Sequence, residues 1–162
     1  MKKYSKQYQR LFAIWAIKCA ERVLPFFEKA YPKDKRPRKA IETCRTWVKN
    51  GVFKMAVIRK ASLDAHKAAK DTKENNAACF AAHAAGQAVA TAHVPQHAFG
   101  PAYYSLKLVA YNSDNNTAKL VKEFKWQAKH LPKHLRQDWK DWNSERLPKN
   151  LRRAWQDFLK IK

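Results

Sequence analysis

The chain has 162 residues, with 34 Lys and Arg against 13 Asp and Glu, and a formal net charge of +21 at pH 7. Apolar residues make up 46% of the sequence and aromatic residues 12%, which excludes a disordered chain despite the charge. Only three glycines are present, which argues against sheets joined by tight turns. The composition predicts an all-α fold, a compact single-domain helical bundle of about six to eight helices over residues 1–162.

Three amphipathic helices are expected in the first half of the chain. Apolar residues recur at helical spacing from Tyr4 to Ala30, although Pro25 is expected to kink or split this helix. A second helix is expected over residues 37–50, since it opens on a proline and ends on Asn-Gly. A third is expected from about Phe53 to Lys73, with Leu63 facing the core.

The middle of the chain lacks charged side chains. Residues 75–106 contain no Asp, Glu, Lys or Arg, whereas charged residues make up 29% of the whole chain. Residues 77–94 predict an alanine-rich central helix, whose small side chains let neighbouring helices approach closely. A proline then breaks the pattern, and a second central helix is expected over residues 96–111. This segment is therefore expected at the centre of the fold.

The C-terminal part contains an internal repeat. After a polar loop, a helix is expected over residues 117–130. Residues 131–142 are then echoed by residues 147–158, and each unit opens on Leu-Pro-Lys and continues as a short helix. Two units are too few for a solenoid, so residues 131–162 are expected to pack on the rest of the domain.

Four side chains in the central segment are of types that bind zinc. Cys79 and His83 are four residues apart, as are His93 and His97. Pro95 interrupts the second pair, and no acidic residue lies near either pair in the sequence. The favoured interpretation is that no metal or other cofactor binds, and that the histidines are neutral and hydrogen-bonded to backbone or to Tyr103 and Tyr104.

No feature of the sequence predicts an enzyme. Cys79 lacks an orienting third group that would make it a nucleophile, and no phosphate-binding loop or hydrolase motif is present. The three cysteines are an odd number without a C-x-x-C pair, which favours the reducing cytoplasm. No apolar run is long enough to cross a membrane and no signal-peptide cleavage pattern follows the first helix, so no membrane association is expected.

The excess of basic residues points to an anionic partner. The candidate binding surface consists of Lys33, Lys35, Arg36, Arg38, Lys39, Lys133, Arg136, Lys149, Arg152 and Arg153. Tryptophans alternate with the basic residues of the repeat, so nucleic acid is one candidate partner if the rings are exposed. If the tryptophans pack inward, the same residues form an ordinary solvated basic surface.

Several sequence patterns together resemble one bacterial family. They are residues 36–42 with Trp47 and Gly51, residues 85–94, residues 97–104, and Trp126 with Leu131-Pro132 and Leu135-Arg136. Together they resemble the immunity-protein-five-like family of polymorphic toxin systems over residues 11–136. Its pattern includes Arg36, Pro37, Arg38, His93, His97, Tyr103 and Tyr104, and its most specific part is residues 85–104, here called the signature segment.

The resemblance implies an all-helical protein that neutralises a toxin by binding it, and it carries over no catalytic residue. The sequence analysis therefore predicts a cytoplasmic immunity protein that binds a cognate toxin. The net charge predicts an acidic face on that toxin and fast, salt-sensitive association. The alternative is a basic helical protein that binds nucleic acid.

Overall fold

A computed structural model describes residues 1–161. Within these residues the chain forms eight α-helices and two short 3-10 helices, and no strand, which confirms the all-α prediction. In chain order they are α1 (Lys6–Ala30), α2 (Arg36–Asn50), α3 (Met55–Asp71), α4 (Asn76–Ala90), η1 (Pro95–Ala98), α5 (Phe99–Ser113), α6 (Thr117–His130), η2 (Lys133–Leu135), α7 (Arg136–Arg146) and α8 (Lys149–Leu159).

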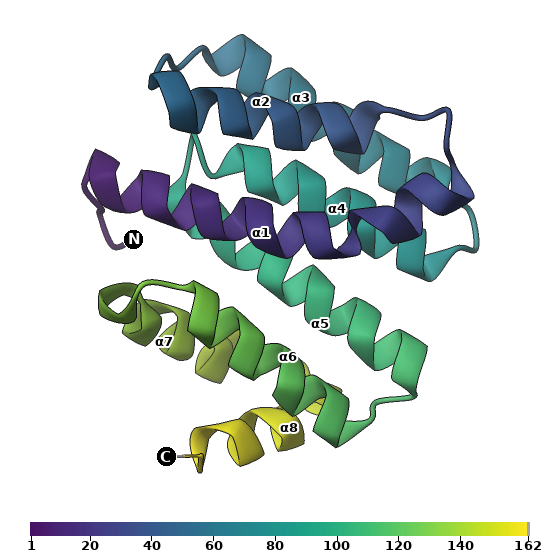
Figure 1. Cartoon of the computed structure of the whole chain (residues 1–162), viewed down its shortest axis with the longest axis vertical. Helices are drawn as coiled ribbons and strands as arrows, with labels where there is room; N and C mark the ends of the chain where they lie inside the picture. Colours follow the sequence, from purple (N-terminus) through teal and green to yellow (C-terminus); the bar gives the residue numbers. More distant parts are fainter. Residues whose placement is uncertain (162) are drawn as a thin grey trace.

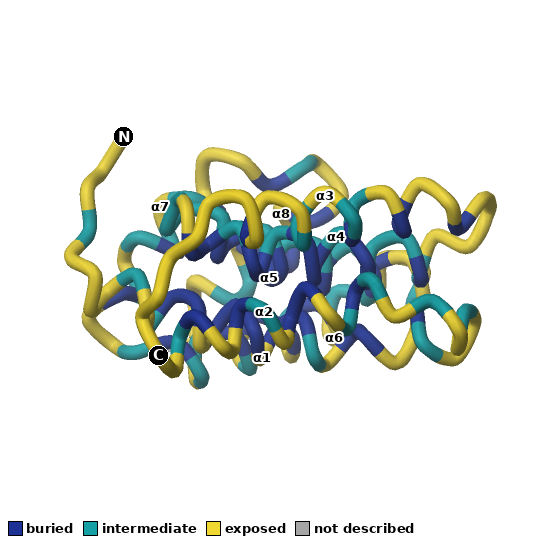
Figure 2. The backbone as a smooth tube through the Cα atoms, turned by 90° about the horizontal axis from the view of Figure 1, so that it is seen from above, coloured by how far each residue is buried: buried dark blue, intermediate teal, exposed yellow. Residues whose placement is uncertain are grey.

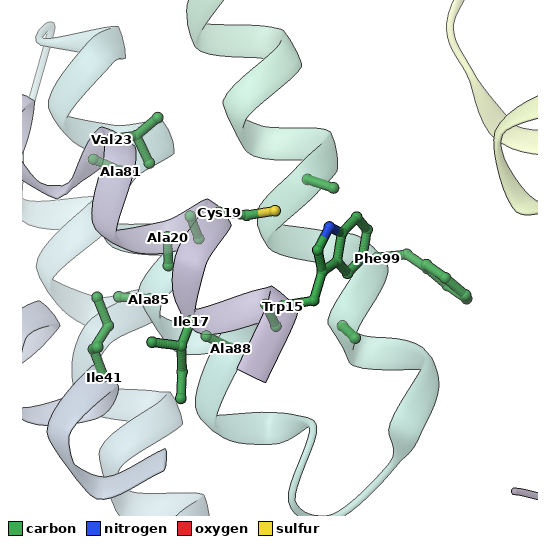
Figure 3. Packing of buried hydrophobic residues seen from close by; sticks show 14 of the residues in the cluster. Trp15, Ile17, Cys19, Ala20, Val23, Ile41, Ala81, Ala85, Ala88 and Phe99 are labelled. Carbon is green, nitrogen blue, oxygen red and sulfur yellow. The ribbon is translucent and has the colours of Figure 1, made fainter. Parts of the chain in front are cut away.

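Helix α4 is the centre of the fold, as the uncharged segment predicts. It contacts α1, α2, α3 and α5 (Figure 1). Its fully buried residues are Ala78, Ala81, Ala82, Ala84, Ala85, Gly86, Ala88 and Val89. Because these side chains are so small, the larger apolar groups of neighbouring helices, such as Ile17 and Ile41, lie directly against the α4 backbone (Figure 3).

Helix α1 remains one helix across Pro25, so the prediction of a split is wrong. Pro25 is exposed, and the carbonyl that loses its hydrogen bond therefore lies on the water-facing side of the helix. The prediction for α3 is wrong at Leu63, whose side chain is exposed. Helix α3 instead buries Ile58 and three alanines, because it contacts α4 along a narrow stripe of small residues.

The C-terminal repeat is a repeat in three dimensions. Arg136 Nε donates to the carbonyl oxygen of Leu131 at 2.9 Å, and Arg152 Nε donates to that of Leu147 at 3.0 Å. The equivalent rings of Trp139 and Trp155 lie edge to face with centroids 5.3 Å apart, and both are buried. Of the two arrangements open for these tryptophans, the inward one is therefore correct.

The bundle is elongated. Helices α2 and α3 lie at one end of its long axis and α8 lies at the other (Figure 1). Viewed from above, the buried stretches of the helices face one another inside the bundle, whereas the connecting loops are exposed (Figure 2).

Candidate partner-binding site

The four candidate metal ligands do not form a shared site. Among residues 1–161, no three His, Cys, Asp or Glu side chains are placed to hold a metal ion. His83 instead faces His66 on α3, with their Nδ1 atoms 2.7 Å apart. His97 Nδ1 lies 2.7 Å from Gln87 Oε1, and the exposed His93 stacks on Phe53. The half-buried Cys79 lies one turn before His83 on α4.

The predicted basic surface is divided between distant parts of the molecule. Lys33, Lys35, Arg36, Arg38 and Lys39 lie around the start of α2, whereas Lys133, Arg136, Lys149, Arg152 and Arg153 lie on the C-terminal repeat. These elements occupy opposite ends of the long axis (Figure 1). The structure therefore does not bring the ten residues together into one surface.

Two arginines of the first cluster bind acidic residues of the chain itself. Arg36 bridges Asp34 and Asp71, which ties the start of α2 to the end of α3. Arg38 pairs with Glu28 of α1. These ion pairs raise the pKa of Arg36 and lower that of Asp34, and hydrogen bonding is the largest cause of both shifts. Both arginines thus position α2 against its neighbours.

A different site lies between α3 and the signature segment. A cavity of about 330 Å³ opens there. Its α3 wall is formed by one helical stripe, Met55, Ile58, Arg59, Ser62, Leu63 and His66, and its other wall by Gln87, Ala90, His93 and His97. Ser62 Oγ donates to the carbonyl oxygen of Gly86 at 2.9 Å, which holds the two walls together.

Two glycines of the signature segment make room for the polar groups of this cavity. A Cβ atom at Gly86 would lie 2.8 Å from His66 Nε2. A Cβ atom at Gly100 would lie 2.6 Å from both Cβ and Cγ of Gln87. Since ordinary contacts between carbon atoms are about 3.5 to 4.0 Å, alanine fits at neither position without displacing a neighbour. Gly100 thus allows Gln87 to hold His97, and Gly86 allows His66 to lie on α4.

Three histidines in or beside the cavity have lowered pKa values, which favours their neutral form. Burial first, and then the nearby His83, His97 and Lys70, together lower the pKa of His66 to about 4. The pKa values of His83 and His97 are also lowered, again chiefly by burial. His83 stacks on Tyr104 with ring centroids 5.1 Å apart, so the predicted tyrosine neighbour is present, but as a stacking partner. Tyr103 in turn lies edge to face against Tyr104.

The cavity adjoins an exposed apolar surface. Around the α2–α3 connection, five large apolar side chains are each between 43% and 56% exposed: Val52, Phe53, Met55, Val57 and Leu63. We use the name α2–α3 surface for these five side chains together with the three hollows that surround them, which are described in the next paragraph. A concentration of exposed apolar side chains in one region is characteristic of sites that bind another macromolecule.

Three adjacent hollows surround the α2–α3 connection. The histidine-lined cavity shares Ile58 with a second hollow and His93 with a third, and the second and third share Trp47. Four cationic side chains line them: Lys6, Arg10, Lys54 and Arg59. Of the residues that the structure describes, no Asp or Glu lines any of the three. The α2–α3 surface thus combines an apolar centre with a purely cationic rim.

Sequence analysis missed this site for a definite reason. Leu63 was expected in the core because helical periodicity cannot distinguish a core stripe from a stripe that lines an open cavity. His66 was overlooked because it is distant in sequence from the signature segment. The spacing of Met55, Arg59, Ser62 and His66, which places them on one face of a helix, is the signal that was available.

Fold and site together define a small all-helical domain with a histidine-lined cavity beside an exposed apolar surface. Over residues 1–161, none of the helices has the length and apolar content needed to cross a bilayer. Residues 2–134 match the model of the family described as "Imm-5 like putative immunity protein". The match covers most of the chain, so the chain belongs to this family, as the resemblance implied. Neither the curated proteins nor the solved structures include a match.

The family match ends before α7, so it includes the histidine-lined cavity and the whole α2–α3 surface. Helices α7 and α8 lie outside the matched residues. The family assignment supports a role in immunity that is not enzymatic, and it names no partner.

Proposed function

We propose that this protein binds a cognate bacterial toxin in the cytoplasm and neutralises it by covering the toxin's working surface, without catalysing a reaction. The observation that supports this proposal most strongly is the α2–α3 surface. An apolar centre with a polar rim is the usual anatomy of a protein–protein interface. Membership of an immunity-protein family supplies the class of partner.

The cationic rim indicates the chemistry of the toxin surface. Lys6, Arg10, Lys54 and Arg59 line the three hollows without an acidic neighbour among the described lining residues. A complementary surface would carry carboxylates around an apolar patch. The basic residues elsewhere on the chain, including Lys33, Lys35, Lys39, Lys133, Lys149 and Arg153, add long-range attraction that accelerates association at low salt.

Nucleic acid is the less favoured partner. A protein that binds single strands needs exposed aromatic rings beside its cations. In the repeat, Trp139 and Trp155 are buried. The two basic clusters also lie at opposite ends of the bundle (Figure 1).

The test is to express the product of the gene beside this one as the candidate toxin, and to measure its binding to variants on and off the α2–α3 surface. Phe53→Ser and Leu63→Ser remove apolar contact area from exposed positions, so they should leave stability within about 0.5 kcal/mol of the parent. We expect each to weaken toxin binding at least tenfold. Leu159→Ser is the matched control, because Leu159 is similarly exposed but lies on α8.

Affinity should also decrease as salt is raised. The proposal is wrong if the neighbouring toxin does not bind, or if Leu159→Ser weakens binding as much as Phe53→Ser does. Binding of arbitrary oligonucleotides with a steep salt dependence, without toxin binding, would instead establish the nucleic-acid alternative.

A further inference from the structure

The histidine-lined cavity has a size and lining suited to one aromatic ring. Its volume of about 330 Å³ is at the lower end of the range of roughly 300 to 1,000 Å³ for small-molecule sites. Met55, Ile58 and Leu63 supply aliphatic walls, and Ala90 leaves the α4 side open. Rings that insert into such pockets are common anchors of protein–protein interfaces.

His97, which lines the cavity, has a ring nitrogen that is available as a hydrogen-bond acceptor. An amide oxygen only accepts hydrogen bonds, so the contact with Gln87 Oε1 places the proton of His97 on Nδ1. The other ring nitrogen, Nε2, then carries a lone pair. Nε2 has no hydrogen-bond partner among residues 1–161. It is also not fully buried, since it is absent from the buried polar atoms that lack a partner. Nε2 is therefore accessible from outside the protein.

This arrangement selects against a carboxylate as the group that meets His97. A carboxylate only accepts hydrogen bonds, as does a neutral Nε2, so the two would pair only if His97 took up a proton. Burial and the neighbouring His93 lower the pKa of His97 and oppose that uptake. A hydroxyl group donates to Nε2 without any change of protonation.

We propose that the cavity receives the side chain of a tyrosine from the toxin, whose phenol ring contacts Ile58 and Leu63 and whose hydroxyl donates to His97 Nε2. This inference rests on the proposed function for the identity of the partner. The cationic rim places the toxin's acidic residues around that tyrosine, since Arg59 and Lys54 line the cavity and the adjoining hollow.

The site can be tested without the toxin by using p-cresol, which is the side chain of tyrosine. Toluene lacks the hydroxyl group, and 4-methylbenzoate replaces it with a carboxylate. We expect p-cresol to bind with a Kd of about 1 mM, as befits so small a ligand. It should shift the NMR signals of Ile58, Ala90 and His97, and it should bind about tenfold more tightly than toluene. 4-Methylbenzoate should shift the signals of His97 less than p-cresol does at pH 7, because its carboxylate is attracted to Arg59 in the lining and cannot donate to His97 Nε2.

His97→Ala should abolish the preference for p-cresol over toluene, and His130→Ala, on α6, should preserve it. Circular dichroism and urea unfolding of both variants show whether they are folded. If His97→Ala does not fold, Leu63→Ser provides the second variant, because it should weaken p-cresol and toluene alike. Equal binding of p-cresol and toluene, equal shifts of the His97 signals by 4-methylbenzoate and p-cresol, or shifts confined to another part of the surface would overturn the inference.

Toxin experiments separate this inference from the proposed function. If the toxin binds, one of its Tyr→Phe variants should lose about tenfold in affinity, and p-cresol should compete with the toxin. If the toxin binds but no Tyr→Phe variant loses affinity and p-cresol does not compete, the tyrosine anchor is refuted and the proposed function is not. A toxin that does not bind refutes the proposed function, whereas the p-cresol measurements still decide whether the cavity is a phenol site.

Discussion

Replacing Gly100 with alanine is a direct test of how the cavity is built. The new Cβ would lie 2.6 Å from Cβ of Gln87, about 1 Å short of an ordinary carbon contact. Because Cβ of Gln87 is attached to the α4 backbone, no side-chain rotation removes the overlap. The first turn of α5 must instead move away from α4.

The cost follows from what that first turn carries. Phe99 precedes Gly100, is 3% exposed, and contacts Phe12 with ring centroids 5.4 Å apart (Figure 3 shows it beside Trp15). Overpacking of a dense core costs about 1 to 3 kcal/mol, and the better helix propensity of alanine offsets at most about 1 kcal/mol. The expected net loss is about 1 to 2 kcal/mol, which lowers Tm by about 2 to 8 °C in a domain of this size.

Urea unfolding of a double-mutant cycle identifies the cause. Gln87→Ala removes Cγ and Cδ but keeps Cβ, so Gly100→Ala should remain destabilising in that background. Gln87→Gly removes Cβ as well, and Gly100→Ala should then cost less than about 0.5 kcal/mol. If Gly100→Ala is as stable as the parent, or costs the same in the Gln87→Gly background, the close approach of α4 and α5 is not what requires glycine.

Three further predictions concern the cavity and the repeat. Gly86→Ala should lower stability by about 1 kcal/mol through contact with His66. In a His66→Ala background the same change should be neutral or stabilising by up to about 1 kcal/mol. The urea midpoints of the parent, the two single variants and the double variant decide this. The pKa of His66 is lowered from 6.5 to about 4, so the unfolded state binds more protons between these values, and stability should fall as pH is lowered from 6.5 towards 4. Allowing for partial exposure of the ring, stability should fall by about 1 kcal/mol between pH 6.5 and pH 5. The fall should be smaller in His66→Gln when urea unfolding is measured at pH 6.5 and at pH 5. Arg136→Ala and Arg152→Ala should each cost about 1 kcal/mol, and unequal losses would show that the two repeat units are not energetically equivalent.

The sequence was sufficient to predict the helical class, the central position of α4 and the bounds of α6. The charge-free residues 75–106 predict the central position of α4, because a segment without charged side chains in so basic a chain is expected to be mostly buried. The repeat was also visible, and its two arginine contacts show that similar sequence here means similar local geometry.

The candidate site could not be predicted in the same way. Sequence patterns within one helix report which face is apolar, but they do not show whether a neighbouring helix covers that face. Leu63 and Ile58 both belong to the stripe of α3 that lines the cavity, yet Ile58 is buried and Leu63 is exposed, and no pattern within α3 distinguishes the two. The pairing of His66 with His83 likewise depends on the register between two helices.

The two glycines of the signature segment indicate which part of the molecule is specialised. Glycine inside a helix costs about 1 kcal/mol relative to alanine, and an alanine-rich core helix would ordinarily tolerate alanine at position 86. Glycine is needed there because His66 lies on α4, and at position 100 because Gln87 holds His97. A bundle built for stability alone would contain neither polar group. The conflict between local helix stability and these contacts is typical of functional sites. In this protein it occurs at the cavity. Arg36 and Arg38 of the predicted basic surface, by contrast, hold α2 against its neighbours. Under the proposed function, binding would depend first on the cavity and its apolar margin, and the net charge of +21 would act on the rate at which a partner arrives.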